Sequence, residues 1–177
     1  MNYGMGNMNK NRCYNFSAGP AMLPLEVMEQ AQAEFLNWRD SGMSVMEISH
    51  RSSDFKLLAE QSEHDLRDLL SIPNNYQVLF LHGGARSQFA MIPMNIAKDF
   101  PYTAYLRTGV WSEASAEEAE RYNKVKIISD TQANGYRDLP ASVDPKIFSE
   151  AAYLYYVDNE TVNGVEFNSY QKVRRCH

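Results

Sequence analysis

The chain has 177 residues and a net charge of −5, with 44% apolar and 22% charged residues. This length and composition are typical of one soluble globular domain with a sizeable core. The acidic balance, without a long basic run, argues against nucleic-acid binding, and no apolar run is long enough to span a membrane.

The N-terminal residues 1–13 are rich in Asn, Gly and Met and lack the apolar core of a signal peptide, so we expect a disordered leader. Cys13 and Cys176 lie near opposite ends of the sequence and have no metal-ligand spacing. They predict unpaired thiols in a reducing cytoplasm, and no metal site.

Two helices are expected in the first half of the chain. Residues 24–40 carry apolar side chains at helical spacing, and Gly42 is suited to the C-terminal cap. Residues 54–71 form a second amphipathic pattern, which Ser52 or Ser53 would cap. Its predicted buried stripe comprises Phe55, Leu58, Ala59, Ser62, Leu66, Leu69 and Leu70.

A glycine pair near the middle of the chain is the most informative local pattern. Strand character over residues 76–81 stops at Gly83 and Gly84, and a helix-opening segment with Ala85 and Arg86 follows. Glycines allow a close backbone approach, the free N–H groups of a new helix attract an anion, and an arginine adds charge. The stretch predicts a phosphate site, although such a pattern alone is more often a plain strand–turn–helix with a solvated arginine.

The rest of the chain alternates helices and strands. Helices are predicted over residues 86–98, with a bend at Pro93, and over 112–121 and 144–151. Strands are predicted over residues 103–106, 125–129 and 153–157, and loops over 109–112 and 130–140. This alternation indicates an α/β fold with a mostly parallel sheet flanked by helices.

Five segments, in order, closely resemble phosphoserine aminotransferases, which are class-V aminotransferases. They are Asn15–Pro24, Ser44–Arg51, Leu81–Phe89, Gly109–Ser112 and Asn159–Gly164. The resemblance covers residues 14–167 and implies the fold of type I transferases that depend on pyridoxal 5′-phosphate (PLP). Several independent motifs in order are a much stronger signal than one glycine loop.

The resemblance also implies an activity. Such enzymes are homodimers that move an amino group between L-glutamate and 3-phosphohydroxypyruvate, a phosphorylated 2-oxo acid, giving O-phospho-L-serine and 2-oxoglutarate. The reaction belongs to serine biosynthesis, and in bacteria the same enzyme often serves pyridoxine biosynthesis through a phosphorylated hydroxythreonine.

Four residues are implied to bind the cofactor. Ala85 and Arg86 would donate backbone N–H groups to the PLP phosphate, and Trp111 would stack on the pyridine ring. Thr161 would form a hydrogen bond to the cofactor. Taken alone, an aromatic residue near a strand end, such as Trp111, is more often part of the core, and a threonine after a strand, such as Thr161, would otherwise be a helix cap.

Three residues are implied to meet the substrate. Arg51 would clamp its carboxylate, because a guanidinium group matches a carboxylate with two parallel hydrogen bonds. His50 would assist in binding the substrate phosphate, with a solvated loop histidine as the alternative. Ala18 would contribute only its backbone.

The catalytic lysine that the resemblance requires is missing. That lysine and the acid that faces the pyridine nitrogen would both follow the last residue, so we expect the truncated N-terminal half of such an enzyme. Lys172 follows Gln171 as in the family, but it lies too early in the sequence.

The tail, residues 168–177, loses the family pattern abruptly, and we interpret it as read out of frame after a frameshift or premature stop. We expect the chain to be inactive alone. The alternatives are a non-catalytic module that binds PLP or a partner, and an unstable fragment without function.

Overall fold

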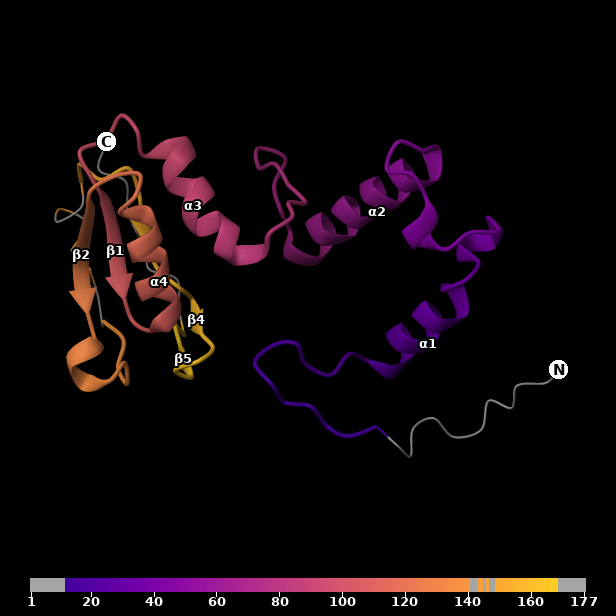
Figure 1. The fold of residues 1–177 in the computed structure, drawn as a ribbon, viewed down its shortest axis with the longest axis horizontal. Coiled ribbons are helices and arrows are strands. Elements are labelled where there is room, and N and C mark those ends of the chain that lie inside the picture. The colour runs from indigo at the N-terminus through magenta and orange to yellow at the C-terminus, as the bar shows by residue number, and fades with distance from the viewer. Residues whose placement is uncertain (1–11, 141–142, 145, 147–148, 169–177) are drawn as a thin grey trace. The chain divides into compact units, whose positions relative to one another are not determined.

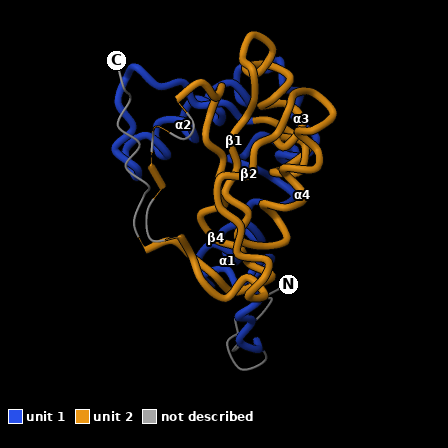
Figure 2. Tube along the Cα trace, turned by 90° about the vertical axis from the view of Figure 1, so that its left-hand side faces the viewer, with its two compact units in different colours: residues 1–80 blue, residues 81–177 orange. Residues whose placement is uncertain are grey.

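The computed structural model describes residues 12–140, 143–144, 146 and 149–168. The chain divides into two compact units, residues 1–80 and 81–177, which Figure 2 distinguishes by colour. The two units differ in burial: Trp38 and Ser44 are the buried residues described in the first, and all the others lie in the second. The predicted leader, up to residue 11, lies outside the described residues.

The first unit contains α1 (Leu25–Glu34), two 3-10 turns and α2 (Ser53–Leu70) (Figure 1). The turns are η2 (Trp38–Asp40) and η3 (Val45–Glu47). The prediction of one helix over residues 24–40 is therefore wrong at its C-terminal end. The side chain of Asn37 accepts a hydrogen bond from the N–H of Gly42 at 2.7 Å, and this local turn competes with helix continuation.

Helix α2 matches its predicted limits, but its apolar stripe does not match the predicted burial. Ser52 caps it as expected, because its Oγ accepts the N–H of Phe55 at 3.2 Å. No residue of α2 is buried, and Leu69 and Leu70 are 80% and 62% exposed. The other apolar members of the predicted stripe, Phe55, Leu58, Ala59 and Leu66, are half-buried, so the stripe is less buried than predicted.

The predicted strand over residues 76–81 is absent as well. These residues are described without strand structure, and Leu79 and Phe80 are exposed. A strand is stabilised by hydrogen bonds to a neighbouring strand, and no described strand pairs with this segment. The strand propensity of residues 76–81 is therefore not enough to form a strand without a neighbouring strand.

The second unit contains a three-stranded sheet in the order β2-β1-β3, and both pairings are parallel. The strands are β1 (Thr103–Arg107), β2 (Val125–Asp130) and β3 (Leu154–Tyr155). Helix α3 (Gly84–Ile96) precedes β1, and α4 (Val110–Ala119) follows it and packs against both α3 and β1 (Figure 1). The predicted parallel sheet with flanking helices is confirmed.

The remaining elements are short. A 3-10 turn, η4 (Gln132–Asn134), lies within the predicted loop over 130–140, and β4 (Asn159–Glu160) pairs with β5 (Val165–Glu166) in an antiparallel hairpin. The helix predicted over residues 144–151 falls partly outside the described residues. None of the described helices is long and apolar enough to cross a membrane.

The core of the second unit forms between β1 and α4. Tyr105 is buried with Ala116 and Ala119, and its ring stacks on that of Tyr155 with 5.0 Å between centroids. The hydroxyl groups of Tyr105 and Tyr153 are 2.8 Å apart and share a hydrogen bond. Burial raises the pKa of Tyr105, so this phenol stays protonated inside the core.

An ion pair joins the carboxyl ends of β1 and β2. Strand register places Arg107 opposite Asp130, and their side chains form an ion pair, while Glu113 of α4 lies 3.7 Å from the same guanidinium. The hydrogen bond from Arg107 holds the pKa of Asp130 below its ordinary value. Arg107 is therefore occupied within the fold.

Replacing Asp130 with asparagine should lower the free energy of unfolding at pH 7 by about 1 kcal/mol or less, since exposed ion pairs contribute little. Because the folded-state pKa of Asp130 is lowered, the carboxylate stabilises the fold above the ordinary aspartate pKa of about 3.9. This contribution is lost as the pH falls through the lower, folded-state pKa. Thermal unfolding at several pH values checks this.

The midpoints of wild type and Asp130→Asn should therefore converge in acid. Asp99→Asn serves as the control, because Asp99 is exposed and forms no hydrogen bond or ion pair among the described residues. A difference that stays constant from neutral pH down to about pH 3 would contradict the role given to this pair.

Candidate functional site

The glycine pair forms a tight turn into α3. Gly83 and Gly84 have φ angles of 92° and 60°, in the left-handed region that favours glycine. A Cβ atom on Gly83 would lie 2.3 Å from Ser87 Oγ. A larger residue at this position is therefore disfavoured by both the φ angle and the steric clash. The turn therefore depends on glycine, as the sequence pattern indicated.

Ala85 and Arg86 lie in the first turn of α3, and both are exposed. The first N–H groups of a helix have no partner within it, and the i→i−4 pattern begins here with Ser87 N–H to Gly83 O at 3.4 Å. Among the described residues, Arg86 forms no ion pair or side-chain hydrogen bond. Free N–H groups beside an unpaired cation are suited to binding an anion.

Trp111 lies in the first turn of α4, where the sequence predicted a loop. The helix begins at Val110 after the N-cap Gly109, two residues before the predicted start at Ser112. The Oγ of Ser112 accepts the N–H groups of Thr108 and Gly109 at 2.8 and 3.0 Å, and so closes the turn from inside the helix. Because the Ser112 hydroxyl binds the backbone that precedes it, the helix begins two residues before Ser112, and the predicted start was therefore too late.

The structure brings Trp111 and Thr161 together from positions fifty residues apart. The indole Nε1 of Trp111 donates a hydrogen bond to Thr161 Oγ1 at 2.9 Å. Both side chains are partly exposed, so each can contact a ligand. Because Thr161 accepts from the indole, its own hydroxyl hydrogen is free to be donated.

Two further residues hold this arrangement, and the sequence analysis assigned them no role. Glu160 accepts the N–H of Trp111 at 2.9 Å and that of Ser112 at 2.8 Å, one at each carboxylate oxygen. Asn163 Oδ1 accepts the N–H of Val110 at 3.0 Å. The available signal was the Asn159–Gly164 motif, in which an acid and an amide flank Thr161.

Gly109 makes this contact possible. A Cβ atom there would lie 2.4 Å from Glu160 Cδ and 2.7 Å from Asn163 Oδ1. Its φ of 176° is ordinary extended backbone, so the need for glycine comes from space and not from conformation. The turn after β4 thus packs directly on the backbone that starts α4.

The predicted substrate residues lie in the first unit. His50 and Arg51 are exposed in the turn before α2, where Ser49 Oγ accepts the N–H of Arg51 at 3.3 Å, and Ala18 is exposed near the start of the described chain. No hydrogen bond among the described residues joins Ala18 to this turn. Their meeting with the residues of the second unit stays a prediction.

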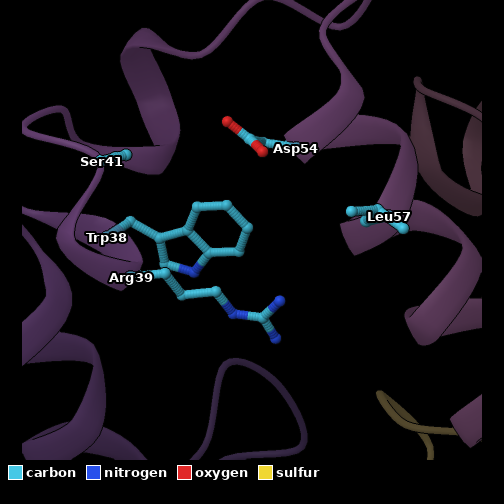
Figure 3. Close-up of a pocket in the computed structure, with 5 residues that line it drawn as sticks. All are labelled: Trp38, Arg39, Ser41, Asp54 and Leu57. Carbon is cyan, nitrogen blue, oxygen red and sulfur yellow. The ribbon is translucent and has the colours of Figure 1, made fainter.

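A pocket in the first unit is lined by Trp38, Arg39, Ser41, Asp54 and Leu57 (Figure 3). The guanidinium carbon of Arg39 lies 4.8 Å from the centre of the Trp38 ring, a cation–π contact. The residues that line the pocket include none of the predicted substrate or cofactor residues. Among the described residues, no group of three His, Cys, Asp or Glu side chains could hold a metal ion.

Comparison with known proteins finds phosphoserine aminotransferases among the relatives of this chain. A phosphoserine aminotransferase of Pseudomonas entomophila is 49% identical over 157 residues, which are 89% of this chain and 44% of the relative. One from Nitrosomonas europaea is 49% identical over 156 residues, 88% of this chain and 42% of the relative. The chain spans less than half the length of these relatives.

Solved structures agree with this. Phosphoserine aminotransferase from Bacillus circulans subsp. alkalophilus matches 92% of this chain and 45% of its own, with a TM-score of 0.84 and 40% identity. The PLP-bound phosphoserine aminotransferase of Trichomonas vaginalis matches 92% of this chain and 46% of its own, with a TM-score of 0.78 and 40% identity.

The family described as aminotransferase class-V matches residues 13–177, which is nearly the whole sequence. The match includes residues 168–177, for which we predicted a loss of pattern; residues 169–177 lie outside the described part, and that prediction is not tested. The fold, the five motifs and the relatives all agree on one family. This chain belongs to the class-V aminotransferases.

Proposed function

We propose that the second unit binds pyridoxal 5′-phosphate. The observation that carries this proposal is the exposed first turn of α3, where unpaired N–H groups lie beside the free guanidinium of Arg86. This arrangement fits a phosphate group. The partly exposed indole of Trp111, already oriented by Thr161, fits an aromatic ring. The PLP-bound state of the Trichomonas vaginalis relative supports the same assignment.

Each residue has a definite part in this proposal. Ala85 and Arg86 bind the phosphate through backbone N–H groups, and the Arg86 side chain adds positive charge. Trp111 lies against the ring and excludes water from one face, and Thr161 donates its hydroxyl hydrogen to the cofactor. When bound, PLP supplies the electron sink that amino-group transfer requires.

For the longer enzyme we propose the reaction that the relatives' name states, amino transfer that forms phosphoserine. Its substrates would be L-glutamate and 3-phosphohydroxypyruvate. Arg51 would bind the substrate carboxylate through its planar fork, His50 would assist at the phosphate, and Ala18 would offer its backbone. We also propose a cytoplasmic homodimer with roles in serine and pyridoxine biosynthesis.

The chain as it stands is proposed to hold PLP without a covalent bond. This proposal rests on the family resemblance, which places the lysine that it requires, and the acid that would face the ring nitrogen, outside these 177 residues. A separate binding module and a non-functional fragment remain outcomes of the experiments below, and no comparison favours either.

Replacing Arg86 with alanine should weaken PLP binding by about tenfold or more, because it removes a charged partner of the phosphate. Equilibrium dialysis of the full chain measures the dissociation constant for PLP and for pyridoxal, which lacks the phosphate. The affinity for pyridoxal should change little. Equal losses for both ligands would contradict the assignment of Arg86 to the phosphate.

Arg121→Ala is the matched control for Arg86→Ala. Arg121 is an exposed arginine of the same unit, in the turn that follows α4, and it pairs with Glu118. This variant should bind PLP as the wild type does. If the wild-type chain binds PLP no better than pyridoxal, the phosphate site itself is absent and the proposal fails.

The purified chain should show no transaminase activity above that of free PLP, because it lacks the lysine that moves the proton. The assay supplies L-glutamate and 3-phosphohydroxypyruvate and measures 2-oxoglutarate. Borohydride reduction followed by peptide mapping should find no single lysine that carries the cofactor. Turnover, or one specifically labelled lysine, would contradict the prediction.

A further inference from the structure

We propose that Glu160 is the positioning residue of the candidate cofactor site. Its carboxylate holds the first turn of α4, and thereby places the Trp111 indole against the Thr161 hydroxyl. The consequence for PLP rests on the proposed function, whereas the placement of the indole does not.

Glu160 is completely buried, with 0% of its surface exposed. The hairpin of β4 and β5 lies beside the first turn of α4 (Figure 1). The two carboxylate oxygens of Glu160 accept the N–H groups of Trp111 and Ser112 at 2.9 and 2.8 Å. The negative charge also faces the positive end of the α4 dipole, which stabilises it.

The geometry requires a carboxylate and not an amide. Each oxygen of Glu160 faces a backbone N–H donor, so both ends of the group must accept. Glutamine has the same shape, but its NH₂ group would point at one of these donors and leave that N–H buried without an acceptor. Glu160→Gln therefore breaks the contact with almost no change in volume.

The carboxylate also requires space beside the start of α4, which Gly109 provides. Gly109 has no Cβ atom, and one built there would lie 2.4 Å from Glu160 Cδ and 2.6 Å from its Oε2. Asn163 adds a third acceptor from the same turn, for the N–H of Val110. Three consecutive N–H groups of α4 are thus bound by the last residue of β4 and the short turn that follows it.

This turn also carries Thr161, the residue next to Glu160. The backbone of Trp111 is bound by Glu160 while its indole is bound by Thr161, so two adjacent residues hold both ends of one tryptophan. Loss of the carboxylate contact frees the helix start, and the indole hydrogen bond is then no longer constrained. Glu160 acts on the ligand through Trp111 and touches no ligand itself.

The first experiment needs no cofactor. Trp38 and Trp111 are the two tryptophans of the chain, so Trp38→Phe leaves Trp111 as the only indole reporter. In this background, Glu160→Gln should shift the Trp111 emission to longer wavelength and increase its quenching by acrylamide. Glu117→Gln, an exposed carboxylate on the same helix, should change neither. Unchanged Trp111 emission and quenching in Glu160→Gln would overturn the proposal.

Far-UV circular dichroism shows whether each variant is folded. If Glu160→Gln does not fold, Gly109→Ala takes its place as the test of the carboxylate contact. Asn163→Ala removes only the Val110 acceptor and tests the neighbouring contact at the same helix start. It should produce a smaller shift in the same direction. Gly109→Ala, which displaces the carboxylate without removing its charge, should reproduce the effect of Glu160→Gln, and an unchanged Trp111 in Gly109→Ala would overturn the proposal.

The second experiment measures PLP binding by equilibrium dialysis in a double-mutant cycle. Glu160→Gln should weaken PLP binding by about tenfold in the wild-type background, and should have little further effect in the Trp111→Phe background. An equal loss in both backgrounds would show that Glu160 does not act through Trp111. If the wild type binds no PLP, the proposed function fails, while the fluorescence result still decides the role of Glu160.

Discussion

A buried carboxylate contact between two distant segments holds the second unit together at its candidate site. Glu160 is fully buried, and its carboxylate accepts two of the first N–H groups of α4. These N–H groups have no partner within the helix. The contact gives the first N–H groups of the helix an acceptor, and it gives the buried carboxylate two hydrogen-bond donors. It also explains why Gly109 precedes the helix, since a larger residue would occupy the place of the carboxylate.

The two units reach their secondary structure by different means. In the first, short-range hydrogen bonds define the elements: Ser52 caps α2, and Asn37 bonds to Gly42 beyond α1. The apolar side chains of these helices stay mostly exposed. In the second unit, Tyr105 and its neighbours bury the middle of the sheet, so packing and hydrogen bonding support each other. The candidate cofactor residues lie in this better-packed unit.

Much of the fold was predictable because it follows local rules. The α/β alternation, the limits of α2 and the glycine turn before α3 all come from patterns within about twenty residues. The resemblance to phosphoserine aminotransferases added a family, which the comparisons confirm. The strand predicted over 76–81 is absent because no described strand pairs with it, and the stripe of α2 is at most half-buried, because burial depends on packing partners that a local pattern does not contain.

The sequence by itself determined the family, the glycine turn at Gly83 and Gly84 that we propose to bind a phosphate, and the choice of Trp111 and Thr161 as candidates. These depend on residue types at fixed spacing, which a sequence displays directly. Only the tertiary structure decided that Trp111 and Thr161 are joined, and that Glu160 and Asn163 hold the start of α4. Hydrogen bonds between residues fifty positions apart depend on how the sheet and hairpin fold the chain back, and no local pattern contains that information.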